Sequence, residues 1–352
     1  MIELNKGLRW CVGTLPQVEQ GTYLGEFPIR DDIGTGESGH GYVLRMAVVN
    51  CLGGLPAVKK MLGKTRYAVL EDTDAHRIAG WFGANLARLS RALGSTGIGK
   101  AEGGFEFCGH SIGRSYFVNR MYPRVCALCS ADEPYCKSQW ELSLATTCHL
   151  HCVALIDSCP WCGSDLSWNR PSLMTCKCGG NLASMQNLRD SSAFENAISR
   201  WLAMKLHPQD DVNCIESARK TMHLDMESAL TRLIKPLTLG GGMQLIYALG
   251  TAQRSDVSEL RVSHRKKSSI VSASEILLQA NAMVSKLMDF QHVEFRQSNL
   301  SVVVKLLAET AKANSDAADR SLALSLIYVL LRQGGRSNWK SRYPQLSQYE
   351  LF

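Results

Sequence analysis

A series of closely spaced cysteines between residues 126 and 178 constrains this chain more than any other feature of its sequence. Short-range pairs of metal-binding side chains recur there. They are Cys126 and Cys129, Cys148 and His151, Cys159 and Cys162, and Cys176 and Cys178. A tight turn between the two members of a pair points both ligand atoms at one centre, and two such turns complete the tetrahedron that zinc prefers. The spacing therefore predicts two Zn2+ ions per chain.

The assignment of these eight residues to two ions has more than one solution. Taken in chain order, the pairs form a site of three cysteines and one histidine, followed by a site of four cysteines. An interleaved arrangement, in which the first and third pairs share an ion, uses the same ligands. His149 or Cys152 is an alternative ligand in the second pair. Every arrangement fills both sites with protein ligands, which predicts structural rather than catalytic metal.

A disulfide framework is the main alternative for clustered cysteines, and it is typical of short secreted chains. This chain has 352 residues, an odd total of 13 cysteines, and no apolar run after a basic segment at its start. We therefore expect a reducing, cytoplasmic setting, and the absence of a long apolar stretch predicts no membrane span. Cys136 is either a spare thiol or a surface residue. The scattered cysteines are expected to be buried thiols, namely Cys11, Cys51, Cys108 and Cys214.

The N-terminal region, residues 1–119, is expected to form an arm followed by a helix-turn-helix-like domain. Apolar residues have helical spacing from residue 42 to 51, Gly53 and Gly54 break the helix, and Pro56 suits the first turn of a second helix. Basic residues on or just after that second helix are candidates for DNA phosphate contacts, although a helical hairpin with solvated lysines has the same pattern. These candidates are Lys59, Lys60, Lys64 and Arg66.

A further helix is predicted from Asp74 to Leu93, and glycines favour loops and short strands over residues 94–119. Residues 120–182 are expected to form two tandem zinc modules. Within them Trp140 is predicted to be a core residue, and Trp161 and Trp168 are candidates for the core or for a surface patch, with the core favoured.

Residues 183–352 are expected to form a helical bundle, so the predicted fold class is mainly α. One helix is predicted at residues 194–202, another after the glycines at 240–242, and three long amphipathic helices after the basic segment 255–271. A polar, basic segment precedes these three helices and is either a solvated linker or a second nucleic-acid contact. Its candidate residues are Arg261, Arg265, Lys266 and Lys267.

Charge and motifs narrow the classes of function. The formal net charge is +7, and it falls to about +4 when two zinc ions replace seven thiol protons, which permits a nucleic-acid contact without requiring one. The chain has no G-x4-G-K-[ST] phosphate loop. The His-x-Glu motif of zinc deaminases does not precede its cysteine pairs. We therefore expect a protein that is not an enzyme.

The region around the second and third pairs resembles the TniQ/TnsD family of transposon target-selection proteins. The resemblance rests on Cys148-x2-His151-x3-Leu155-x3-Cys159-Pro-x-Cys162-Gly, preceded by Cys126-x2-Cys129 and Trp140, and on the helix-like segment 42–50. Ala127 departs from the pattern, because many members have a proline after the first cysteine. The resemblance covers residues 40–180 and implies a non-catalytic adaptor in DNA transposition.

As implied by the resemblance, the partners are a TnsC-like AAA+ ATPase and either a Cascade-type RNA-guided complex or target DNA, and the adaptor forms a homodimer. The chain length and weak net charge favour the Cascade-type partner of a CRISPR-associated transposon. The alternative is a stand-alone zinc-containing helix-turn-helix DNA-binding regulator, which would bind a specific duplex without partners.

Overall fold

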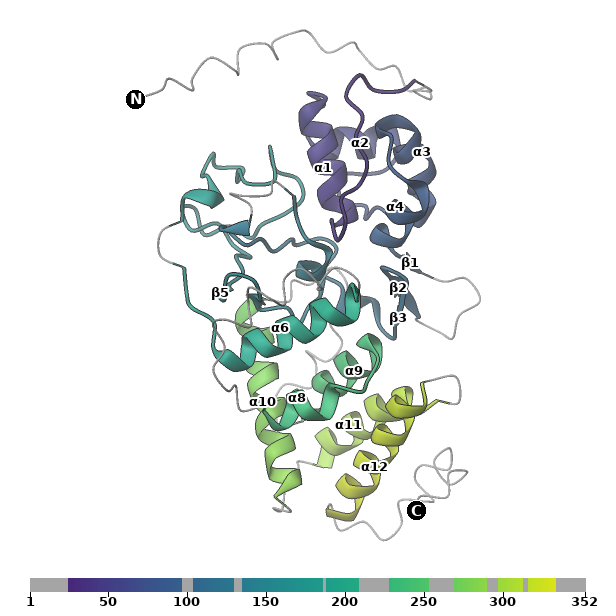
Figure 1. Cartoon of the computed structure of the whole chain (residues 1–352), viewed down its shortest axis with the longest axis vertical. Coiled ribbons are helices and arrows are strands. Elements are labelled where there is room, and N and C mark those ends of the chain that lie inside the picture. Colours follow the sequence, from purple (N-terminus) through teal and green to yellow (C-terminus); the bar gives the residue numbers. More distant parts are fainter. Residues whose placement is uncertain are drawn as a thin grey trace.

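The computed structural model describes residues 25–96, 104–129, 135–185, 188–208, 228–252, 269–289, 297–312 and 316–333. Within these ranges the chain is mainly α-helical, as predicted, with short strands and two cysteine-rich clusters. Figure 1 shows an elongated molecule with helices α1 to α4 at one end and helices α11 and α12 at the other. None of the helices in the described ranges has the length and hydropathy needed to cross a membrane.

The N-terminal helices are α1 (Gly39–Val49), α2 (Leu55–Met61), α3 (Asp72–Phe82) and α4 (Leu86–Leu93). The side chain of Ser38 accepts a hydrogen bond from the backbone of Gly41 and caps α1. Gly54 enters α2 with a φ of 89°, a left-handed conformation that glycine adopts without a steric penalty. Pro56 occupies the first turn of α2. The predicted helix, glycine break and second helix are therefore confirmed for this region.

The single helix predicted from Asp74 to Leu93 is wrong, because the segment forms two helices. Gly83 adopts a left-handed φ of 84° and its backbone N–H bonds to Ala79, which ends α3. Two residues later, the side chain of Asn85 accepts from the backbone of Arg88 and starts α4.

Short strands and 3-10 turns connect these helices to the rest of the chain. Strands β1 (Ser95–Thr96), β2 (Phe105–Phe107) and β3 (His110–Ile112) form an antiparallel sheet in that order. Cys108 and Gly109 both have positive φ and make the tight turn between β2 and β3. Strands β4 (Thr147–Cys148) and β5 (Val153–Ala154) form a second antiparallel pair. The 3-10 turns are η1 (Ser115–Phe117), η2 (Ser138–Glu141) and η3 (Leu182–Ser184).

The C-terminal part is helical, and the three long helices predicted after the basic segment 255–271 are present. Its helices are α6 (Ala193–Leu206), α8 (Ala229–Ile234), α9 (Leu239–Gly250), α10 (Ile270–Met288), α11 (Gln297–Thr310) and α12 (Ala317–Gln333). Helix α9 lies at the centre and contacts α6, α10, α11, α12 and strand β3. The buried apolar residues form one continuous core from the N-terminal helices through the cysteine-rich region to α12.

Helix α9 begins earlier than predicted, because the three glycines lie inside its first turns rather than before it. A methyl group at Gly240 would overlap the backbone of Ser111, and one at Gly242 would overlap the ring of Trp201. A methyl group at Gly241 would overlap the carboxylate of Asp319, which also accepts a hydrogen bond from the backbone of Thr238 at 2.9 Å. The glycines therefore let three distant segments approach α9 closely.

Candidate metal centres

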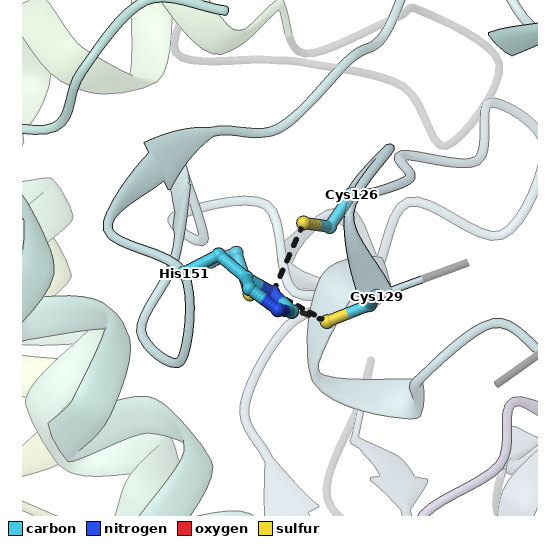
Figure 2. Close-up of side chains that lie close together, drawn as sticks. Cys126, Cys129 and His151 are labelled. Atoms are coloured by element: carbon cyan, nitrogen blue, oxygen red, sulfur yellow. Dashed lines mark hydrogen bonds between the residues drawn. The ribbon is translucent and has the colours of Figure 1, made fainter. Parts of the chain in front are cut away.

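The first candidate centre contains Cys126, Cys129, Cys148 and His151. Cys126 follows Val125, whose backbone pairs with Ile156 through hydrogen bonds of 3.0 and 2.8 Å. Cys148 ends β4, and the turn toward β5 brings His151 back over it. Figure 2 shows the imidazole of His151 pointing toward the sulfur atoms of Cys126 and Cys129. Two segments that are distant in the sequence thus supply one ligand set.

The distances in this centre fit four ligands of one metal ion. His151 Nδ1 lies 3.7, 3.2 and 3.6 Å from the Sγ atoms of Cys126, Cys129 and Cys148. The Sγ atoms of Cys129 and Cys148 are 3.5 Å apart. Zinc–sulfur bonds of ~2.3 Å and zinc–nitrogen bonds of ~2.0 Å place tetrahedral ligand atoms roughly 3.5 to 3.8 Å apart. A disulfide needs sulfur atoms ~2.05 Å apart, so this pair of thiols is not bonded.

The second candidate centre contains Cys159, Cys162, Cys176 and Cys178, whose sulfur atoms all lie within 4.8 Å of one another. The Sγ distance is 3.7 Å between Cys159 and Cys178 and 3.8 Å between Cys162 and Cys176. Each pair lies on a turn completed by a glycine with positive φ. These are Gly163, whose N–H bonds to Cys159, and Gly179, whose N–H bonds to Cys176. The turns explain why the ligands of each pair converge.

The structure groups the eight residues in chain order rather than in the interleaved arrangement. The two alternative ligands have other contacts. His149 Nδ1 lies 3.3 Å from Gln139 Nε2, and burial lowers the pKa of His149 to about 4. The thiol of Cys152 accepts from Asn196 Nδ2 at 3.1 Å. Both candidate centres therefore have four protein side chains and can hold a metal ion without using either residue.

The remaining cysteines and tryptophans differ in part from expectation. Cys136 is buried next to Arg170, and burial raises its pKa to about 12. Cys108 is partly buried, but Cys51 is exposed at the end of α1, so the burial predicted for Cys51 is wrong. Trp140 and Trp168 are core residues as predicted. Cys11 and Cys214 lie outside the described residues.

Trp161 is 51% exposed, so the favoured place in the core is wrong and the surface alternative applies. It lies on the turn between Cys159 and Cys162, where its ring covers Gly180 beside Cys178 instead of entering the core. The short turn between the two cysteines thus directs this side chain toward the neighbouring turn.

Arg124, two residues before the first ligand, is a structural residue that the sequence did not reveal. Its side chain is fully buried, and Nη1 donates to the carbonyls of Leu142, Ser143 and Ala145 at 3.1, 3.0 and 2.6 Å. Burial lowers its pKa to about 10, which leaves the guanidinium charged at neutral pH. Arg124 therefore joins the segment that enters the first pair to the segment that leads to the second pair.

Helix α6 holds the same centre from the other side. Thr147, next to Cys148, donates to Ser199 Oγ at 3.0 Å. One turn earlier on α6, the carboxylate of Glu195 accepts from Arg189 and from Ser274 of α10, the latter at 2.7 Å. Burial opposes ionisation of Glu195, but these hydrogen bonds outweigh it and lower the pKa to about 2. The first centre is thus attached to the C-terminal helices.

The basic residues predicted to contact DNA are in different environments. The ammonium of Lys59 is buried and donates to the Arg66 carbonyl at 3.1 Å, and burial together with Lys64 lowers its pKa to about 8. Lys64 pairs with Asp74. Lys60 and Arg66 are exposed. The second group of candidates lies outside the described residues, namely Arg261, Arg265, Lys266 and Lys267.

Helical packing and two four-residue clusters define a mainly α-helical protein with two cysteine-rich modules that could each hold a metal ion. The TniQ family model matches residues 28–155, and this part of the chain is a TniQ domain. The match spans helices α1 to α4 and the whole first centre, and it ends before Cys159. The domain associates the chain with target selection in transposition. No curated protein matches the chain.

Proposed function

We propose that this protein is a non-catalytic adaptor in DNA transposition that links a target-recognition complex to a TnsC-like AAA+ ATPase. The observation that carries this proposal is the TniQ match over residues 28–155, which includes both the N-terminal helices and a complete set of four metal ligands. The proposal also assigns Zn2+ to both centres.

The donor sets support a structural role for the two ions. Three thiols with one imidazole, and four thiols, are ligand sets typical of structural zinc, and they leave no coordination position for water or substrate. Zinc at such sites contributes folding free energy directly, on the order of 10 kcal/mol in small modules. The two ions would hold the turns of residues 126–178 in place as a rigid docking element.

The shape of the molecule suits an adaptor. The N-terminal helices and the pair α11–α12 lie at opposite ends, with the metal-binding region and α6 to α10 between them (Figure 1). A continuous core joins these parts, so the two ends keep a fixed separation. Two separate surfaces on one rigid body can bind two partners at once.

The environment of α2 favours a Cascade-type complex over naked DNA as the first partner. Helix α2 has only seven residues. Of its basic neighbours, Lys59 is buried and Lys64 is paired with Asp74, which leaves Lys60 and Arg66 facing solvent. Specific duplex binding draws much of its affinity from many phosphate contacts. The small number of available cations on α2 therefore supports recognition of a protein complex rather than of naked DNA.

The test is a binding experiment with the full-length chain. Immobilised protein is exposed separately to the purified ATPase, to the RNA-guided complex and to naked target duplex. The adaptor function predicts capture of the ATPase and of the RNA-guided complex, and weak duplex binding that disappears at physiological salt. Tight, sequence-specific duplex binding without the ATPase would instead identify a stand-alone DNA-binding regulator.

A matched pair of cysteine variants tests the role of the second centre. Cys162→Ser removes a ligand, whereas Cys51→Ser replaces another exposed cysteine outside both centres. We expect Cys162→Ser to lose partner capture together with one metal ion, and Cys51→Ser to retain both. Full capture by a Cys162→Ser protein that has lost one ion would contradict the docking role of this centre.

A further inference from the structure

A cavity of about 140 Å³ lies between the segment that follows α2 and the second metal centre. Lys59, Arg66 and Tyr67 line it on the side of the N-terminal helices. Tyr122 and Lys177 line it on the side of the metal-binding region. Lys177 lies between the ligands Cys176 and Cys178, so the second centre fixes the backbone that carries this cation. We call this cavity the basic pocket.

The basic pocket is cationic. Four of its lining residues are lysines or arginines, and none is an aspartate or glutamate. Lys59 is 6% exposed, and its ammonium uses one of its three donors on the Arg66 carbonyl. Of the four cations, Arg120 is paired with Glu71, and Asp74 pairs with Lys64 outside the pocket, so no carboxylate in the described residues pairs with Lys59. A buried, uncompensated ammonium favours an anion as ligand.

The walls of the basic pocket are held in position by hydrogen bonds. The Arg66 carbonyl accepts from Lys59 Nζ at 3.1 Å and from Asn169 Nδ2 at 3.4 Å, which joins the two sides of the pocket. Trp168 Nε1 donates to the Arg120 carbonyl at 3.0 Å, and the Trp168 ring stacks on His40. Asn169 Oδ1 has no partner among the described residues. The pocket is thus built before any ligand enters and offers both donors and an acceptor.

The aromatic ring of Tyr67 lies next to the cations of the basic pocket. Tyr67 is 65% exposed, and the Arg66 guanidinium lies over its ring at 4.7 Å. A cavity of ~150 Å³ accommodates one benzene ring, so the basic pocket has room for a single phosphate group or a single small ring. An exposed ring with a guanidinium over one face leaves the other face for an unpaired base to stack on. A base inside a duplex does not offer its own face for this contact.

We propose that the basic pocket recognises one unpaired nucleotide of a single-stranded nucleic acid, with the phosphate inside the pocket on Lys59 and Arg66 and the base outside it, stacked on the exposed ring of Tyr67. A nucleotide supplies both a phosphate for the cations and a base for Tyr67, whereas the phosphate of a phosphopeptide would make no contact with the Tyr67 ring. The site goes beyond the adaptor function, because it gives the chain a direct contact with nucleic acid that needs neither the ATPase nor a duplex.

The test is a fluorescence-anisotropy titration of the full-length protein with labelled oligothymidylate, oligouridylate and a duplex of matched length, over a series of salt concentrations. We expect both single strands to bind more tightly than the duplex. Tyr67→Ala should weaken single-strand binding by roughly 5- to 150-fold, and Tyr67→Phe should retain it. Arg66→Ala should lower the slope of log affinity against log salt by about 0.7, the value for one phosphate contact on a single strand.

The control variant is Lys286→Ala, which removes one positive charge from the exposed face of α10, on another part of the molecule. It should leave both the affinity and the salt slope unchanged. Equal binding of duplex and single strands, equal effects of Arg66→Ala and Lys286→Ala, or normal binding by Tyr67→Ala would overturn the proposal. Saturable binding of a phosphoserine peptide that is unaffected by Tyr67→Ala would also overturn it and identify a phosphoprotein ligand.

Discussion

Replacing Arg124 with methionine tests how the first metal centre is supported. Methionine fills much of the space but provides no donor. The Leu142 carbonyl keeps a bond from the backbone of Ala145 at 3.0 Å, whereas the carbonyls of Ser143 and Ala145 lose the Arg124 guanidinium. Each unsatisfied buried carbonyl costs about 1–3 kcal/mol. Methionine avoids the cost of burying a charge, so the expected net loss of unfolding free energy is about 2–4 kcal/mol.

Arg170→Met is the matched control. Arg170 is also buried, but its Nε and Nη1 atoms have no hydrogen-bond partner among the described residues, and its Nη2 lies 3.9 Å from the Cys136 sulfur. Its replacement should change the unfolding free energy by about 1 kcal/mol or less, since few good hydrogen bonds are lost. Urea unfolding followed by tryptophan fluorescence, together with the rate of metal release to a chelator, measures both variants. Equal losses in Arg124→Met and Arg170→Met would refute the reasoning.

Two other predictions follow from the packing and the charges. Gly242→Ala should lower the unfolding free energy by about 1–3 kcal/mol, because the added methyl group overlaps Trp201. The control Gly80→Ala lies in α3 with open space around it and should raise the unfolding free energy by up to about 1 kcal/mol. Equal Tm shifts in the two variants would contradict the close packing of α9. The carboxylate of Glu195 has a folded-state pKa of about 2, below the usual 4.5, so its stabilisation is present above pH 4.5 and is lost as the pH falls toward 2. The advantage of the wild type over Glu195→Gln in urea unfolding should shrink over that range, and an advantage that does not change with pH would argue against the proposed ion pairing.

Local spacing made much of the metal-binding region predictable. Each pair of ligands converges because a short turn connects its members, and this information lies within a few residues. The combination of pairs depends on contacts between distant segments, such as the Val125–Ile156 backbone pairing and the bonds of Arg124. For that reason the sequence left the sequential and interleaved arrangements open.

Other features differ in whether the sequence carries a signal for them. The break between α3 and α4 has a local signal, since Gly83 is a typical helix C-terminal residue and Asn85 is a typical N-cap. The sequence carries no local signal for the role of the glycines in α9, because their neighbours Ser111, Trp201 and Asp319 are far away in the chain. The burial of Lys59 also depends on tertiary structure, because the buried ammonium donates to the backbone carbonyl of Arg66, seven residues later.

The measurement that tests the central claim most directly is the metal content and coordination of the purified protein. Elemental analysis with zinc X-ray absorption should give two Zn2+ ions per chain with seven sulfur and one nitrogen ligand between them. Cys148→Ser should lose the first ion, whereas Cys152→Ser, whose thiol lies outside both centres, should keep both. Native protein without zinc, or zinc with a bound water in place of one of these ligands, would contradict the account.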